Sequence, residues 1–146
     1  MSITVYNRQR SVRFDLVWLR QFAAIARKFS RGVWADVNCP PVEHDEVEVT
    51  VVSDAVIADL HRRFMNIPGP TDVITFAHGE IVMSAGTARR NALRYGHSVE
   101  AELALYTIHG LLHLNGFDDI ETRFAIRMRR VQNRLMKTCL AQMSAV

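Results

Sequence analysis

The most informative stretch of the chain is TIHGLLHLNGFDD, residues 107–119. His109 and His113 are four residues apart, so a helix places both imidazoles on one face, one turn apart. Two imidazoles in that position can hold one metal ion. Gly116 follows three residues later and can take the left-handed conformation that ends a helix. The stretch therefore predicts a metal site built on a helix, a glycine and a turn.

A third ligand is available directly after this glycine. The chain can fold back and present Asp118 or Asp119 to the same ion, and five residues separate His113 from Asp119. The spacing resembles the helix and turn of zinc proteases, but Gly110 stands where His-Glu-x-x-His has its catalytic glutamate. A carboxylate base is missing there, which argues against peptide hydrolysis. The alternative interpretation is that both histidines are packed core residues bonded to backbone.

The segments around this stretch predict strands and helices in a regular order. Periodicity and capping residues predict strands at 3–6, 46–52, 72–76 and 80–84, helices from caps at Asp15 and at Ser53-Asp54 to about 30 and 65, and helices at 87–95, 98–115 and 121–143. The chain has 146 residues, the usual size of one domain. We therefore predict a single α+β (α/β layered) domain over 1–146, with a small mixed four-stranded sheet packed by about five helices.

The composition is that of an ordinary globular protein, with 49% hydrophobic and 23% charged residues. No apolar run approaches the roughly 18 residues of a membrane span, and Arg8 comes before any stretch typical of a signal peptide. We expect a cytoplasmic protein with no membrane partner. Cys39 and Cys139 lie far apart in sequence and are expected to be buried free thiols.

The net charge of +3 is unevenly distributed. Residues 1–34 carry seven Lys/Arg and one Asp (+6), whereas residues 35–60 carry seven acids and no Lys/Arg (−7). Arginine, which binds phosphate bidentately and stacks on bases, supplies nearly all of the positive charge, so the pattern is compatible with an RNA partner. The alternative is a solvated basic helix face.

The stretch 107–119 resembles the signature of the YbeY family of bacterial endoribonucleases and rRNA maturation factors, His-Gly-x-Leu-His-Leu-x-Gly-Tyr-Asp-His. The resemblance covers nearly the whole chain in order. Further similar segments are Pro-Thr-Asp-Val-Ile-Thr-Phe at 70–76, Gly-Glu-Ile-Val-Met-Ser at 79–84, Tyr-Gly-His-Ser at 95–98, Glu-Leu-Ala at 102–104 and Asn-Arg-Gln at 7–9.

This resemblance implies a metal-dependent, single-strand-specific endoribonuclease that acts in ribosomal RNA maturation and ribosome quality control through a metal-activated water. It implies one Zn²⁺ per chain, with His109, His113 and Asp119 as ligands and the two histidines as catalytic residues. The implied partner is RNA, either ribosomal RNA or the small ribosomal subunit. Two alternatives remain: a non-catalytic RNA-binding ribosome-assembly factor with a structural or vestigial metal, and, more weakly, a metallopeptidase.

The chain departs from the family pattern at two positions. Asp119 stands where the family has its third histidine ligand. Aspartate is an accepted zinc ligand, and two histidines with one carboxylate also make Fe, Ni or Mn credible. Met65 stands where the family has an arginine that is thought to face the substrate, so a cation that could clamp a phosphate is absent. Arg62 and Arg63 are close in sequence, but a helix points them elsewhere than position 65.

The remaining polar candidates each have a structural and a functional interpretation. His97 is expected to cap or pack rather than to orient a ligand, and Asp118 is either a partner of a ligand histidine or a turn residue. The hydroxyls of Thr71 and Ser84 could line the cleft or satisfy backbone groups. Two arginine pairs, at 89–90 and 129–130, could contact phosphates or form solvated helix faces.

Overall fold

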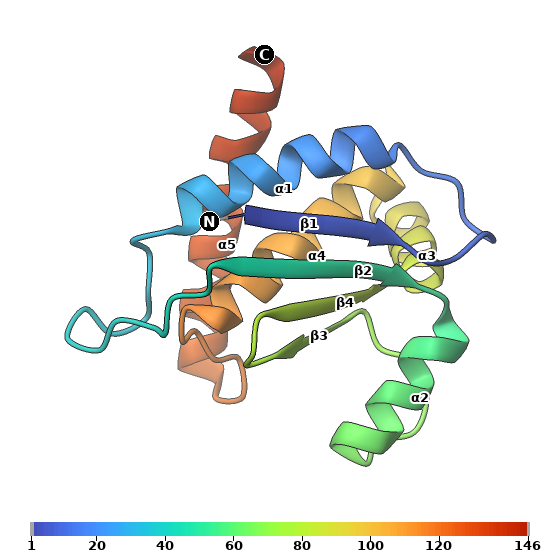
Figure 1. The fold of residues 1–146 in the computed structure, drawn as a ribbon, viewed down its shortest axis with the longest axis horizontal. Helices are drawn as coiled ribbons and strands as arrows, with labels where there is room; N and C mark the ends of the chain where they lie inside the picture. Colours follow the sequence, from blue (N-terminus) through green and yellow to red (C-terminus); the bar gives the residue numbers. More distant parts are fainter. Residues whose placement is uncertain (1, 146) are drawn as a thin grey trace.

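The strands form one mixed sheet in the order β1-β2-β4-β3, in which β1, β2 and β4 are parallel and β3 runs antiparallel to β4 (Figure 1). The computed structural model describes residues 2–145. The strands are β1 (Ser2–Asn7), β2 (Glu46–Val52), β3 (Val73–Phe76) and β4 (Glu80–Ser84). The predicted mixed four-stranded sheet is thereby confirmed.

The five helices follow the order expected from the sequence. They are α1 (Leu16–Ser30), α2 (Asp54–Met65), α3 (Ala85–Tyr95), α4 (Val99–Leu114) and α5 (Thr122–Ala145). Asp15 caps α1 by accepting a hydrogen bond from the Trp18 amide at 3.0 Å. α3 begins two residues earlier than predicted because the Ser84 hydroxyl caps it through the Thr87 amide.

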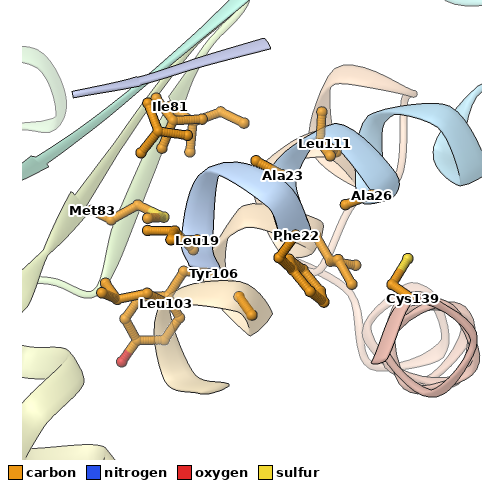
Figure 2. Packing of buried hydrophobic residues seen from close by; sticks show 14 of the residues in the cluster. Leu19, Phe22, Ala23, Ala26, Ile81, Met83, Leu103, Tyr106, Leu111 and Cys139 are labelled. Carbon is orange, nitrogen blue, oxygen red and sulfur yellow. The ribbon is translucent and has the colours of Figure 1, made fainter. Parts of the chain in front are cut away.

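The two faces of the sheet are covered unequally. α1, α4 and α5 pack on one face, where Phe22 and Leu111 lie in the main core (Figure 2). α2 packs on the other face over a small second cluster that includes Ile57. The alternation of glutamate and valine in β2 predicts that one face of the strand is exposed to solvent. This holds only for the first half of the strand. From Thr50 onward β2 is buried on both faces, where the second cluster adjoins it.

α4 lies against the sheet at very short range. Gly110 is buried over Ile81 of β4, and a Cβ atom at position 110 would come within 2.8 Å of the Ile81 side chain. The glycine at the position of the protease glutamate is therefore explained by packing. A larger side chain at this position would have to displace the Ile81 side chain, so the packing observed here leaves no room for a carboxylate base.

An aspartate at the start of α2 joins that helix to α3. Asp54 accepts hydrogen bonds from Arg90 at 2.7 Å, Ser84 at 2.6 Å and Thr87 at 2.9 Å. The Arg90 bond is the main reason why the pKa of Asp54 falls to about 2, with the two hydroxyl bonds adding to it against the effect of burial. Ser84 and Arg90 therefore hold α2 in place rather than face a cleft.

The two cysteines differ in their surroundings. Cys139 is buried on α5, and burial raises its pKa to about 11. Cys39 is exposed, so the prediction that both thiols are buried is wrong for this residue. It lies in the irregular segment between α1 and β2, which runs over the surface and offers no core to pack into. No described helix is both long and apolar enough to cross a membrane.

Replacing Gly110 by alanine tests the close packing of α4. We expect Gly110→Ala to lower the free energy of unfolding. Overpacking the core costs about 1–3 kcal/mol, and this outweighs a helix-propensity gain of about 1 kcal/mol. In an Ile81→Ala background the clash is gone, so the same change should be neutral or stabilising. Urea denaturation of the four proteins measures this coupling. Equal effects in both backgrounds would contradict it.

Candidate metal centre

The last turns of α4 and the turn that follows bring three donor atoms together. His113 Nε2 lies 3.1 Å from His109 Nε2. Asp119 Oδ2 lies 3.4 Å from His109 Nε2 and 3.8 Å from His113 Nε2. Ligands bonded at about 2.0–2.1 Å to a tetrahedral ion stand about 3.3 Å apart. The three separations therefore match one ion between the three side chains.

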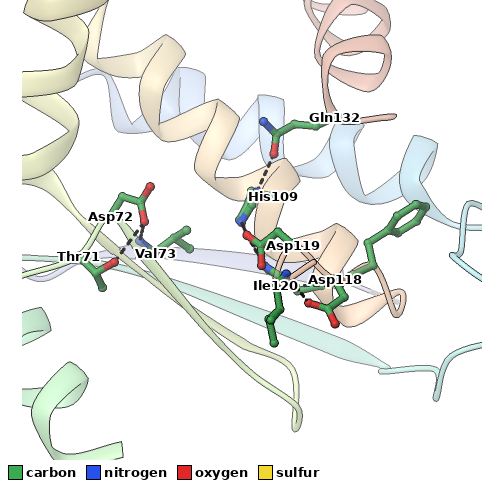
Figure 3. A network of polar contacts seen from close by, with 10 residues as sticks. Thr71, Asp72, Val73, His109, Asp118, Asp119, Ile120 and Gln132 are labelled. Atoms are coloured by element: carbon green, nitrogen blue, oxygen red, sulfur yellow. Dashed lines mark hydrogen bonds and ion pairs between the residues drawn. The ribbon is translucent and has the colours of Figure 1, made fainter. Parts of the chain in front are cut away.

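Hydrogen bonds fix the orientation of both imidazole rings. His109 Nδ1 lies 2.7 Å from the Gln132 Oε1 atom of α5, and His113 Nδ1 lies 2.9 Å from the Phe117 carbonyl oxygen. Both oxygens are acceptors, so each Nδ1 carries the proton and each Nε2 keeps its lone pair. Two lone pairs that face one another at 3.1 Å repel each other unless a cation lies between them. This arrangement fits a metal ion, and Figure 3 shows Gln132 supporting His109 from above.

The protonation state of the site favours ligation as well. Burial lowers the pKa of His113, and the charge of His109 lowers it further, against the opposite influence of Asp119. A neutral imidazole is the form that binds a metal. The two histidine side chains are 25% and 29% exposed and Asp119 is 44% exposed. The three donors are therefore reachable from solvent.

The turn after α4 is built by the residues that the sequence pointed to. Gly116 has a φ of 88°, the left-handed conformation expected to end the helix. Asn115 donates from Nδ2 to the Ser30 and Val33 carbonyl oxygens at 2.8 and 2.7 Å, which fastens the turn to the end of α1. Asp118 accepts from the Ile120 amide at 2.8 Å. Asp118 is thus a turn residue, and Asp119 is the carboxylate that meets the histidines.

The three donors lie in a cavity of about 970 Å³ between the α4 turn, β3 and the segment 35–44. Figure 3 shows Thr71 and Asp72 across from His109 and Asp119. Four carboxylates line the cavity, those of Asp36, Asp72, Asp118 and Asp119, and no described lysine or arginine does. The cavity is therefore acidic, and its polarity suits a cation.

The second position that departs from the family pattern, Met65, also lies in this cavity. Met65, at the end of α2, lines the wall and is 50% exposed. Arg62 and Arg63 both pair with Asp59 on their own helix at 2.9 and 3.5 Å and do not line the cavity. Neither of them replaces the missing cation.

The other polar candidates divide between the cavity and the scaffold. Thr71 lines the cavity, as expected from the functional interpretation, and donates to Asp72 at 3.3 Å. His97 is bonded to Glu102, which is buried, so its role is in packing. The arginines at 89–90 and 129–130 do not line this cavity.

Gln132 is the functional residue that sequence reasoning missed. It lies nineteen residues beyond His113, in a different helix, and no motif spacing connects them. The only available signal was a glutamine among the buried positions Met128, Val131 and Leu135 of α5. A polar side chain on an apolar helix face usually has a buried partner.

The chain is similar to known proteins over most of its length. The family described as Endoribonuclease YbeY matches residues 5–140. This chain belongs to that family. It is similar to the protein named Endoribonuclease YbeY from Desulfitobacterium hafniense, with 38% identity over 112 residues that cover 64% of this chain and 71% of the relative. The protein of the same name from Heliobacterium modesticaldum is 31% identical over 118 residues, covering 66% and 71%.

A solved structure supports the architecture. The solution structure of TM1509 from Thermotoga maritima matches with a TM-score of 0.63 at 24% identity, over 98% of this chain and 92% of that one. At this identity the likeness concerns the fold alone. Together with the family match, it confirms the α+β fold class and the resemblance read from the motifs.

Neighbouring aspartates allow a matched test of the donor set. We expect Asp119→Ala to weaken Zn²⁺ binding by more than about tenfold. Removing a residue that merely hydrogen-bonds to a metal ligand already weakens binding by about that factor. Asp118→Ala should weaken it far less, because that carboxylate bonds to a backbone amide. Competition with a chromogenic chelator measures both affinities, with thermal unfolding as the control for folding. Unchanged affinity in both variants would place the third ligand elsewhere.

Proposed function

We propose that this protein is a metal-dependent, single-strand-specific endoribonuclease that acts in the cytoplasm in ribosomal RNA maturation and ribosome quality control. The observation that carries the proposal is the pair of imidazoles whose Nε2 lone pairs converge with Asp119 in an open cavity. The relatives named Endoribonuclease YbeY support RNA as the substrate. Ribosomal RNA or the small ribosomal subunit is the proposed partner.

We propose Zn²⁺ as the cofactor, one per chain, held by the Nε2 atoms of His109 and His113 and by a carboxylate oxygen of Asp119. A bound divalent ion supplies a Lewis acid that polarises water and a phosphoryl oxygen for hydrolysis of a phosphodiester. The carboxylate ligand keeps Fe, Ni or Mn as further possibilities for the resident metal.

The chain's own residues orient this chemistry. Gln132 and the Phe117 carbonyl hold the two imidazoles so that their lone pairs stay aimed at one point. The cavity is recessed, and a flexible single strand can bend into it more readily than a stiff A-form duplex. This difference supports a preference for single-stranded RNA.

A second candidate function rests on Met65. With methionine there and no described lysine or arginine lining the cavity, a phosphate in the cleft meets no side-chain cation. This favours a non-catalytic RNA-binding factor for ribosome assembly in which the metal is structural. A metallopeptidase is the weakest candidate, because the packing of Gly110 on Ile81 leaves no room for a glutamate base.

Cleavage of single-stranded ribosomal RNA separates the two main candidates. We expect the purified protein to cut the RNA, a chelator to abolish cutting, and His109→Ala/His113→Ala to reduce it by at least about a thousandfold, as loss of a catalytic metal would. Products are resolved on denaturing gels. RNA that is bound by the metal-loaded protein yet left intact would favour the assembly factor, and a peptide panel tests the peptidase.

Replacing Asp119 by histidine tests how the carboxylate ligand affects turnover. Asp119→His should raise turnover, because a neutral imidazole leaves more of the ion's positive charge available to polarise water. Asp118→His is the matched control for adding a histidine to the turn and should not raise turnover. Single-turnover rates with saturating enzyme give the comparison. A slower Asp119→His variant with full metal content would show that the site is built for the carboxylate.

A further inference from the structure

A second cavity adjoins the metal cavity and has the opposite charge. It measures about 350 Å³ and is lined by Arg27 and Arg31 from the end of α1. Pro40, Pro41, Val42, His44 and Asn115 line both cavities. The segment 40–44 is therefore a shared rim, and a chain that lies across it reaches both sides. We call the second cavity the arginine pocket.

The two guanidinium groups in the arginine pocket are not neutralised within the protein. Neither Arg27 nor Arg31 forms an ion pair with a described carboxylate, whereas Arg62, Arg63, Arg90 and Arg123 do. Burial lowers the pKa of Arg27, the neighbouring Arg31 lowers it further, and Glu43 at the pocket wall acts in the opposite direction. Two cations that repel each other form a site for an anion.

The arginine pocket also holds donors without acceptors. Arg27 is anchored by one hydrogen bond to the His44 carbonyl oxygen, but its Nε atom is buried without a partner. The indole Nε1 of Trp34, a residue that also lines the pocket, is likewise buried without a partner. Unmet buried donors are unfavourable, and two of them belong to residues that line this pocket.

The proposed reaction creates a need for these cations. A single strand carries a negative charge on every nucleotide, and the metal cavity is lined by four carboxylates and no described cation. The ion itself can offset only part of that repulsion. Binding of RNA therefore requires positive charge close to the cavity but outside it.

Other arginines near the metal cavity are less suited to binding an RNA phosphate. Arg127 lines a third cavity, but Asp36 and Asp118 line it too, and Arg127 already bonds to the Ala35 carbonyl oxygen and lies over the Phe117 ring. Arg62 is paired on α2. Both neighbouring cavities share a wall with the metal cavity, but the arginine pocket sets two guanidinium groups against one carboxylate, that of Glu43, whereas Arg127 stands alone beside two aspartates.

We propose that Arg27 and Arg31 bind a backbone phosphate of the single-stranded RNA beside the nucleotide held in the metal cavity. This inference rests on the proposed function. It makes the two arginines positioning residues for the substrate and assigns no part in bond cleavage to them.

Binding of a fluorescein-labelled single-stranded oligoribonucleotide to the metal-loaded full chain tests the proposal. We expect Arg27→Gln/Arg31→Gln to weaken binding by at least about tenfold, since two charge-assisted bonds are lost. The slope of log Kd against log salt should fall by about 0.7, because one phosphate is no longer neutralised. Arg10→Gln/Arg13→Gln is the matched control. It removes the same charge from two exposed arginines that precede α1, at the end of the helix away from the arginine pocket (Figure 1).

The outcomes distinguish this proposal from the proposed function. If the two double variants weaken binding equally, or if the salt slope of Arg27→Gln/Arg31→Gln is unchanged, the arginine pocket is not a phosphate site, even when RNA is cut. If the Arg27→Gln/Arg31→Gln variant loses binding selectively while wild type cuts no RNA, the pocket stands and the nuclease proposal fails. Arg31→Gln alone removes an exposed side chain and should lower the slope by less than about 0.7 without affecting folding. A purely structural role of Arg27 would lower the melting temperature of Arg27→Gln and leave its salt slope unchanged.

Discussion

The contact between Gly110 of α4 and Ile81 of β4 is the constraint on which the site depends. Because position 110 has no side chain, α4 lies close against the sheet and its orientation about its own axis is set. His109 and His113 then emerge on the flank that faces the turn and α5, where their ring nitrogens find Gln132 and the Phe117 carbonyl. A rotation of α4 would separate both rings from these acceptors.

The site combines a cavity whose side chains favour a cation with a neighbouring cavity whose side chains favour an anion. Carboxylates around the converging imidazoles favour a metal ion and oppose a phosphate, whereas Arg27 and Arg31 across the shared rim do the reverse. Such a separation keeps the guanidinium groups away from Asp119, whose carboxylate they would otherwise bind in competition with the metal ion. It also places the two attractive regions on either side of one short segment, 40–44.

The irregular segment between α1 and β2 has a larger role than its composition indicates. Asn115 binds the carbonyls of Ser30 and Val33 and so ties the start of this segment to the metal-bearing turn. His44 meets the Ala77 carbonyl at 2.8 Å and fixes the other end beside the β3–β4 turn. The segment is therefore held at both ends, and this allows an irregular loop to shape two cavities.

The sequence by itself determined the order of strands and helices, the caps at Asp15 and Ser53, and the place of both histidines and Gly116, because periodicity, capping and helix spacing are local properties. Local spacing left Asp118 and Asp119 equivalent and the family resemblance implied Asp119, and in the folded turn Asp119 meets the imidazoles while Asp118 closes the turn. The tertiary structure likewise decided the support of His109 by Gln132, the exposure of Cys39 and the position of the α1 arginines in a pocket that shares a wall with the metal cavity. Each depends on which distant segments pack side by side, and that packing is fixed by the burial of α4 among the sheet, α1 and α5 rather than by any pattern along the chain.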